Sequence, residues 1–196
     1  MAERAPAHGL IVLAAGASRR LGRSKQLLRL QGETLVRRAT RLGLESDPDT
    51  AVIVLAADAD AVFAQVSDLA VRRVDCSDAD HGMGASLRAG LAALPEICGA
   101  ALVLVCDQPA LDAAHLQRLC AAWRAAPQLA AASQYARTLG VPAVLPRAWF
   151  ADLVNVVSDR GARALLAARA GEVIAVRNEA LALDVDHAGD LGVTDS

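Results

Sequence analysis

Three short, uninterrupted apolar runs constrain the fold of this chain more than any other feature. They cover residues 9–15, 51–57 and 100–106. Runs in which every residue is apolar are typical of strands buried on both faces, as in a parallel sheet. The segments between and after them repeat apolar residues at helical spacing: Leu35, Ala39 and Leu42; Met83, Leu87, Gly90, Leu91 and Leu94; Leu116, Leu119, Cys120 and Trp123. This alternation predicts right-handed βαβ units and an α/β sheet covered by helices on both faces.

The pattern loosens after Pro127. We expect short strands over 129–133 and 143–145, and a helix over 160–169 that Ser158 or Asp159 caps. Two more strands are predicted over 172–176 and 181–185. No linker, repeat or low-complexity segment interrupts the chain, so we expect one domain over residues 1–196.

Composition excludes several classes of protein. With 196 residues, of which 54% are hydrophobic, the chain is long and apolar enough for a buried core and unlike a disordered protein. An aromatic content of 3% and a net charge of −2 favour neither nucleic acid nor a membrane surface as partner, and no apolar run approaches a membrane span. Residues 1–8 have no apolar core, so we expect no signal peptide there, and the spacing of the four cysteines fits no zinc site. We therefore expect reduced, packed cysteines and a cytoplasmic location.

Charge is distributed unevenly along the chain. Residues 1–41 contain nine basic and two acidic residues, which predicts an anion site there and a cation site later in the sequence. We assign Arg37, Arg38 and Arg41 to an exposed helix face. Lys25 is the only lysine, and a compact ammonium can reach a phosphate oxygen where a planar guanidinium does not fit.

Ligands of open α/β sheets bind beyond the carboxyl ends of the strands. This rule selects four loops, over residues 16–25, 76–84, 107–109 and 184–187.

The first loop follows the first strand directly and joins small residues to basic ones. Gly16 and its neighbours let the backbone approach phosphate oxygens, to which Arg19, Arg20, Arg23 and Lys25 would add positive charge. The loop has neither the G-x-G-x-x-G of a dinucleotide site nor the glycine spacing and Lys-Ser/Thr pair of a Walker loop. A hydride-transferring enzyme and a P-loop NTPase are therefore both unsupported.

The carboxylates at 107 and at 184 and 186, in two of the other loops, are candidate cation ligands. Asp107 follows the third apolar run, where it could ligate a hard cation, begin a turn or cap the next helix. Asp184 and Asp186 share a face of a predicted strand, and one of them could meet Asp107 around a metal; alternatively, Asp186 caps a helix. Oxygen ligands favour Mg²⁺.

Glycines at 82 and 84 lead directly into a predicted helix. The N-terminus of that helix could hold an anion or the edge of a nucleobase. The alternative is a plain turn, with Met83 and Leu87 in the core. No G-x-S-x-G motif is present, so serine–histidine–acid catalysis is unsupported.

Together, these motifs resemble the MobA-like nucleotidyltransferases, and within them the molybdenum cofactor cytidylyltransferase group. The similarity covers most of the chain and rests on the loop at Gly16 with its Arg20-Leu21-Gly22 and Lys25, and on residues 82–91, 107–109, 140–142, 159–163 and 184–186. Val141, Ser158 and His187-Ala188 depart from the residues common in that group.

The resemblance implies a Rossmann-like fold and the transfer of a nucleoside monophosphate, CMP from CTP, to a phosphorylated acceptor such as molybdopterin. It implies Arg20, Lys25 and Asp107 as catalytic residues and Mg²⁺ held by Asp107 and Asp186. The nucleotide would contact Leu13, Ala14, Ala15, Gly16, Lys25, Gly82 and Ser86, and the acceptor Gln108, Gly140, Gly161 and Arg163. A molybdoenzyme or its maturation chaperone is an expected partner. The alternatives are GTP, a sugar or isoprenoid phosphate acceptor, and a non-catalytic accessory protein that binds a nucleotide or pterin.

Overall fold

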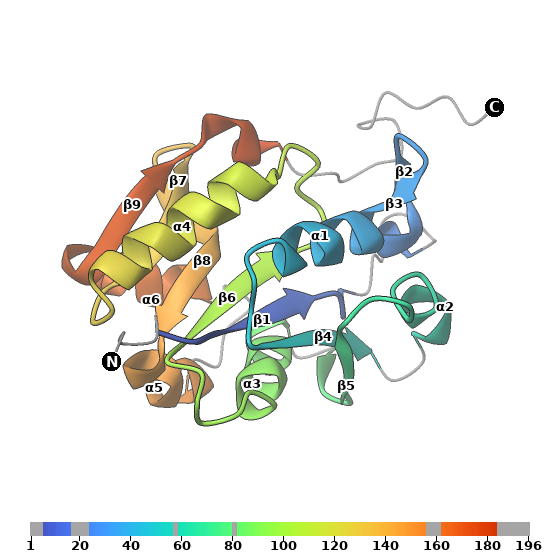
Figure 1. The fold of residues 1–196 in the computed structure, drawn as a ribbon, viewed down its shortest axis with the longest axis horizontal. Coiled ribbons are helices and arrows are strands. Elements are labelled where there is room, and N and C mark those ends of the chain that lie inside the picture. Colours follow the sequence, from blue (N-terminus) through green and yellow to red (C-terminus); the bar gives the residue numbers. More distant parts are fainter. Residues whose placement is uncertain (1–5, 17–23, 57–58, 80–81, 156–161, 184–196) are drawn as a thin grey trace, which may run out of the picture.

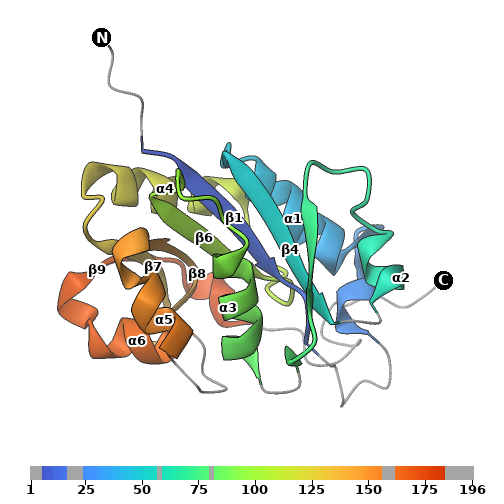
Figure 2. The ribbon, with the colours of Figure 1, turned by 90° about the horizontal axis from the view of Figure 1, so that it is seen from below.

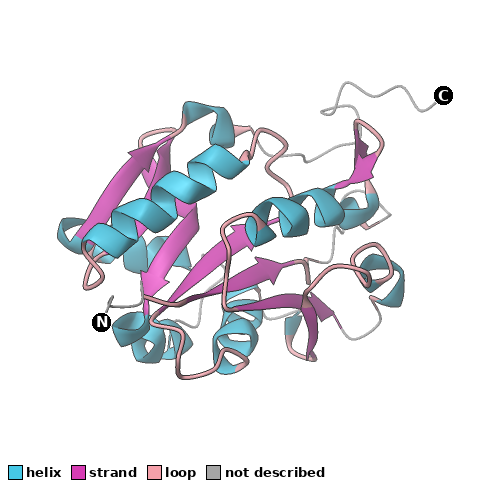
Figure 3. Cartoon of the chain, viewed as in Figure 1, coloured by secondary structure: helices cyan, strands magenta, loops and turns pink. Residues whose placement is uncertain are grey.

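A seven-stranded, mostly parallel sheet forms the centre of the computed structural model, which describes residues 6–16, 24–56, 59–79, 82–155 and 162–183. Its strands lie in the order β5-β4-β1-β6-β8-β7-β9. In chain order they are β1 (His8–Leu13), β4 (Thr50–Ala56), β5 (Arg72–Cys76), β6 (Ala100–Val105), β7 (Ala130–Tyr135), β8 (Thr138–Pro146) and β9 (Val173–Arg177). Only β8 runs against the other strands of this sheet, because it pairs antiparallel with both β6 and β7 (Figure 3).

Helices cover both faces of the sheet, as predicted. On one face lie α1 (Leu35–Leu44) and α4 (Ala113–Ala125), and on the other α3 (Met83–Ala92), α5 (Phe150–Asn155) and α6 (Ala162–Ala168) (Figures 1 and 2). The short α2 (Asp60–Phe63) connects β4 to β5. Within the described residues, no helix has the length and apolar character that crossing a membrane would require.

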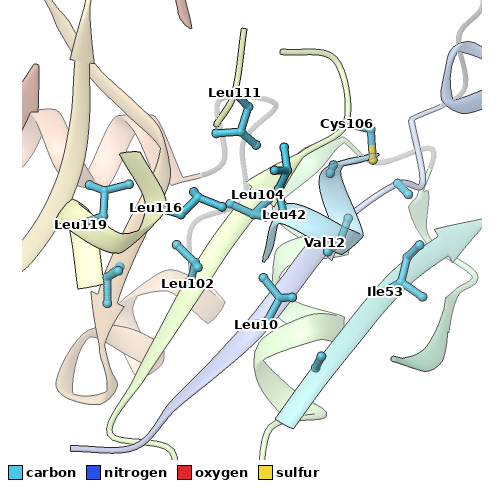
Figure 4. Packing of buried hydrophobic residues seen from close by; sticks show 14 of the residues in the cluster. Leu10, Val12, Leu42, Ile53, Leu102, Leu104, Cys106, Leu111, Leu116 and Leu119 are labelled. Carbon is cyan, nitrogen blue, oxygen red and sulfur yellow. The ribbon is translucent and has the colours of Figure 1, made fainter. Parts of the chain in front are cut away.

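The core explains why the three apolar runs become the central strands. Alternate residues of β1 face opposite helical layers. Leu10 and Val12 pack with Leu42 of α1 (Figure 4). Ile11 packs with Leu87 and Leu91 of α3 on the other face. Because both faces are buried, a polar residue at either set of positions would lose its hydration. The predicted faces of α1 and α4 are buried, whereas Met83 at the start of α3 is 41% exposed and does not belong to the core.

Several elements escaped prediction because their patterns are weak. Strand β5 lies at the sheet edge and buries only its last residue, Cys76, and the hairpin of β2 (Arg29–Leu30) and β3 (Glu33–Thr34) has two-residue strands. The short helices η1 (Lys25–Leu27), η3 (Arg147–Trp149) and η4 (Ala170–Glu172) were also missed. The strand predicted over 181–185 is wrong in its described part, where η5 (Glu179–Ala182) forms a 3₁₀ turn and buries Leu181. Its remaining residues lie outside the described chain.

Candidate functional site

Two neighbouring strands of the sheet end side by side and bring two of the predicted loops together. In the parallel register of β1 and β6, the last residue of β1, Leu13, pairs with the last residue of β6, Val105. Gly16 and Asp107 come three and two residues later, so both follow the same edge of the sheet. The Cys106 thiol lies 3.7 Å from the carbonyl oxygen of Leu13 and marks this junction. The strand rule therefore selected loops that meet in space.

The ammonium of Lys25 contacts the carboxylate of Asp107 at this edge. Its Nζ lies 2.9 Å from Oδ2 of Asp107. Both groups remain partly accessible, with side-chain exposures of 21% and 30%. Because each ion can still be approached from solvent, the pair can exchange its partners with a charged ligand.

Gln26 binds both ends of the first loop. Its Nε2 donates to the carbonyl oxygen of Ala14 at 2.9 Å and to that of Gly16 at 2.8 Å. Its Oε1 accepts a hydrogen bond from the Ser24 hydroxyl at 2.6 Å. Gln26 is buried. A Cβ added to Gly16 would lie 3.7 Å from Nε2 of Gln26, an ordinary contact, so the described surroundings do not require glycine at this position.

The segment after Asp107 is held by a helix on the sheet face. Arg38 of α1 donates to the carbonyl oxygens of Leu111 at 2.9 Å and Pro109 at 3.4 Å. The helix-capping alternative for Asp107 does not apply, because the Asp112 carboxylate accepts from the His115 amide and caps α4. Arg38 was predicted to lie on an exposed helix face, but its guanidinium instead holds this loop.

Three of the four predicted acceptor residues gather around one hydroxyl, that of Tyr135. It donates to the carbonyl oxygen of Val141 at 2.9 Å and accepts from Gln108 at 3.3 Å and, at a longer 3.5 Å, from Arg163. A Cβ on Gly140 would lie 2.6 Å from the Tyr135 hydroxyl oxygen. Glycine at 140 is thus required by Tyr135, which is a structural reason independent of any ligand.

Gln108 is buried beside Tyr135 and makes further hydrogen bonds. Its Nε2 also donates to the carbonyl oxygens of Val141 at 3.2 Å and Leu181 at 3.3 Å. Its Oε1 is buried and has no hydrogen-bond partner among the residues that the structure describes. The amide therefore ties β8 and η5 to the end of β6.

The loop over residues 76–84 leads into α3 through a residue with a positive φ angle. Gly82 has φ 93°, a conformation that favours glycine, and it directly precedes the first helical residue, Met83. Gly84 and Ser86 are buried in the first turns of the helix. The predicted glycine-led helix start is therefore present, and its assignment to a nucleotide stays a prediction.

The remaining predicted residues lie outside the described chain: Arg19, Arg20 and Arg23 of the first loop, Gly161, and the carboxylates of Asp184 and Asp186. Within the described ranges, no cluster of three or more His, Cys, Asp or Glu side chains could hold a metal. Asp107 alone nevertheless fits one type of site, because Mg²⁺ often uses one or two carboxylates and completes its shell with water and substrate phosphates.

Much of the positive charge of α1 is paired within the protein. Arg37 makes two hydrogen bonds with Asp68, at 2.6 and 2.8 Å, and lowers the pKa of that carboxyl to about 2. Arg41 contacts Glu33 and Glu45, and its hydrogen bonds hold the pKa of Glu33 below its usual range. These arginines lie on the helix face as predicted, where carboxylates partner them. Both arginines therefore have carboxylate partners within the described residues.

The cysteines are packed side chains, as expected. All four are free and buried. Burial raises the pKa of the Cys106 thiol far above its usual range and that of Cys120 to about 11. Thiols that stay protonated are poor nucleophiles, so neither supports covalent catalysis.

Comparison with known proteins identifies a family for most of the chain. Residues 10–173 match the model of the MobA-like NTP transferase domain. A probable molybdenum cofactor guanylyltransferase from Opitutus terrae is 38% identical over 61% of the chain, and nicotine blue oxidoreductase from Paenarthrobacter nicotinovorans is 42% identical over 56%. The matches span 59% and 53% of those relatives, respectively.

Solved structures share the whole architecture. Rv0371c from Mycobacterium tuberculosis superimposes with a TM-score of 0.77 and 26% identity, covering 95% of this chain and 96% of its own. A second structure of Rv0371c, a complex with manganese, matches with a TM-score of 0.70 and 26% identity over 89% of this chain and 90% of its own.

Proposed function

Because the chain belongs to the family of MobA-like NTP transferase domains, we propose that it transfers a nucleoside monophosphate from an NTP to a phosphorylated acceptor and releases pyrophosphate. The observation that carries this proposal is the 2.9 Å contact between Lys25 and Asp107 at the carboxyl edge of the sheet. A cation for phosphate oxygens and a carboxylate for a divalent metal stand side by side there. A triphosphate bound with its metal needs both.

The acceptor phosphate is the nucleophile of the proposed reaction. A phosphate monoester loses its second proton near pH ~6, so it is already anionic at neutral pH and needs no general base. One of its oxygens attacks the α-phosphorus of the NTP, a new P–O–P bond forms, and the bond to the β-phosphate breaks as pyrophosphate leaves. Since no proton must be removed, the site's main task is to offset crowded negative charge.

The chain's own residues divide this task. Lys25 and Arg20 offset charge on the leaving β- and γ-phosphates, and backbone around Ala14 to Gly16 lies against the triphosphate. Asp107 and Asp186 are the residues that would hold Mg²⁺, which when bound polarises the α-phosphate. A manganese complex of Rv0371c supports a divalent metal in a protein of this fold.

The two substrates would occupy opposite sides of this edge. The start of α3, with Gly82 and Ser86, is proposed to lie against the nucleobase. Gln108, Arg163 and Gly161 are proposed to line the acceptor side, with Gly140 shaped by Tyr135. A guanidinium such as that of Arg163 is suited to a phosphate group of the acceptor.

For the acceptor we propose molybdenum cofactor, and for the donor CTP. The relative named molybdenum cofactor guanylyltransferase supports the acceptor, and its name favours GTP as the second candidate for the donor. A molybdoenzyme or its maturation chaperone would receive the product. We also propose a cytoplasmic location, which the four free, buried cysteines support.

Pyrophosphate release tests the proposal. The protein is incubated with Mg²⁺, each of the four NTPs, and either molybdenum cofactor, a sugar phosphate or an isoprenoid phosphate, followed by mass analysis of the product. We expect a cytosine dinucleotide of the cofactor. A guanine dinucleotide would correct the base, and another acceptor would correct the substrate. NTP binding without release from any acceptor would contradict catalysis and favour an accessory protein.

A further inference from the structure

We propose that Gln26 is the positioning residue of the proposed triphosphate loop, which sets the placement of Lys25 relative to Gly16. The inference rests on the proposed function, because it concerns how the same loop receives an NTP. It adds a residue that neither the family resemblance nor the motif analysis assigned a role.

Every polar group of the Gln26 side chain is engaged with the ends of the loop. Its two N–H groups can serve the carbonyl oxygens of Ala14, at 2.9 Å, and Gly16, at 2.8 Å, and its oxygen accepts from Ser24. Ala14 and Gly16 are where the chain leaves β1, whereas Ser24 and Gln26 are where it returns through η1. One buried amide therefore hydrogen-bonds to both ends of the first loop.

These hydrogen bonds also restrain the position of Lys25, because Lys25 lies between Ser24 and Gln26 in the sequence. The backbone of η1 is held by the Gln26 side chain and, just past its end, by the carbonyl oxygen of Leu28, which accepts from the Leu35 amide of α1 at 2.8 Å. Nζ of Lys25 then reaches Asp107. A shift of η1 would move the ammonium away from the edge at which a triphosphate would bind.

The amide also directs the loop's carbonyl oxygens. The oxygens of Ala14 and Gly16 both point to Nε2 of Gln26. Carbonyl oxygens that turned toward a triphosphate would repel it, whereas oxygens held by an N–H donor are kept from doing so. Gln26 therefore favours NTP binding in two ways: it places a cation and it restrains two dipoles.

The decisive variant is Gln26→Met, which keeps an unbranched side chain of similar length and removes the amide. Gln117→Met is the matched control, because it makes the same substitution at an exposed position of α4. For each protein, the thermal midpoint, Mn²⁺ affinity without nucleotide, NTP affinity, KM and kcat are measured. The wild-type protein must first bind NTP; if it does not, the proposed function fails irrespective of Gln26.

We expect Gln26→Met to weaken NTP binding and raise KM for NTP at least about tenfold, with kcat within about threefold of wild type. Mn²⁺ affinity should not fall and should rise no more than about fivefold, because Asp107 is retained while Lys25 moves away from it, a result that general unfolding would not give. An unchanged KM for NTP in the folded variant overturns the inference. If Gln26→Met does not fold, Ser24→Ala decides in its place. It removes the hydroxyl that donates to the amide oxygen of Gln26, so KM for NTP should rise about threefold, and an unchanged KM overturns the inference.

Discussion

Lys25 and Asp107 are 82 residues apart in sequence, yet the Lys25 ammonium lies 2.9 Å from the Asp107 carboxylate. Parallel strands β1 and β6 make this possible, because they deliver both loops to one edge of the sheet. Lys25 has two candidate partners, the Asp107 carboxylate and the phosphates of a substrate. Pairing with the first would compete with a metal ion for Asp107, whereas pairing with the second would favour NTP binding.

Lys25→Met should therefore act in opposite directions on the two ligands. Without nucleotide, loss of the competing ammonium is expected to raise Mn²⁺ affinity about two- to fivefold, as for a partly exposed ion pair. NTP affinity should fall at least about tenfold, because a charged donor is lost. Calorimetric titration with Mn²⁺ and then with NTP measures both; a variant that weakens Mn²⁺ binding would exclude competition between Lys25 and the metal.

Tyr135→Phe tests the acceptor side. The substitution removes the hydroxyl on which Gln108 and Arg163 converge but preserves the ring. We expect KM for the acceptor to rise about threefold to tenfold and stability to fall by about 1 kcal/mol, as for one buried hydrogen bond. KM for NTP, measured at saturating acceptor, should not change. An equal rise in both KM values would argue against a role specific to the acceptor.

Two buried histidines should make stability fall in mild acid. Burial lowers the pKa of His8 and of His115 from 6.5 to about 4. The unfolded chain therefore binds more protons between these values, so this stability is fully present above pH 6.5 and is lost as pH falls toward 4. Each histidine should lower the free energy of unfolding by about 2 kcal/mol between pH 7.5 and pH 5.

The hydrogen bonds of His115 fit the neutral imidazole that burial favours, and the residue supplies a control. Ser133 donates to the carbonyl oxygen of Pro142 at 2.7 Å, so its hydroxyl oxygen accepts from Nε2 of His115 at 2.8 Å. Nδ1 is then the acceptor for Arg118, at 3.1 Å, a site that protonation would abolish. Urea unfolding of His115→Gln at both pH values should show about half the wild-type change; the full change would contradict this origin.

Gly90→Ala should destabilise the fold although alanine favours helices. An added Cβ would lie 2.6 Å from Cγ2 of Ile11 and 3.2 Å from Cγ2 of Val54. Both are buried, β-branched strand residues that cannot easily move, so we expect a loss of about 1 to 3 kcal/mol. Gly171→Ala is the control, because nothing lies within 4 Å of its added Cβ. Urea unfolding that gave equal stability for both variants would refute the packing argument.

The sequence predicted best the central strands, where burial on both faces requires apolar residues. The runs that became β1, β4 and β6 differ from the observed strands by at most two residues at either end, because central strands must be apolar on both faces. Edge strand β5 and the β2–β3 hairpin obey no such requirement. The η5 turn was mistaken for a strand because 3₁₀ turns bury single residues such as Leu181 without a lasting period.

The site residues that could be predicted are those whose own side chain and position in a motif indicate their role. Lys25 and Asp107 stood out as a lone lysine and a carboxylate at a strand end. Gln26, Arg38 and Tyr135 did not, because their importance comes from distant backbone groups that the fold brings near. A polar side chain directly beside the lone lysine was the only signal for Gln26, and no sequence pattern marks a residue that braces another.

Pyrophosphate release by Asp107→Asn tests the central claim most directly. The substitution keeps the size of the side chain but removes the negative charge that faces Lys25 and would hold the metal. We predict release at least about 100-fold slower than wild type at saturating NTP, acceptor and Mg²⁺, with a thermal midpoint within a few degrees. Near-normal release by a folded Asp107→Asn protein would contradict the claim that Lys25 and Asp107 together receive a metal-bound triphosphate.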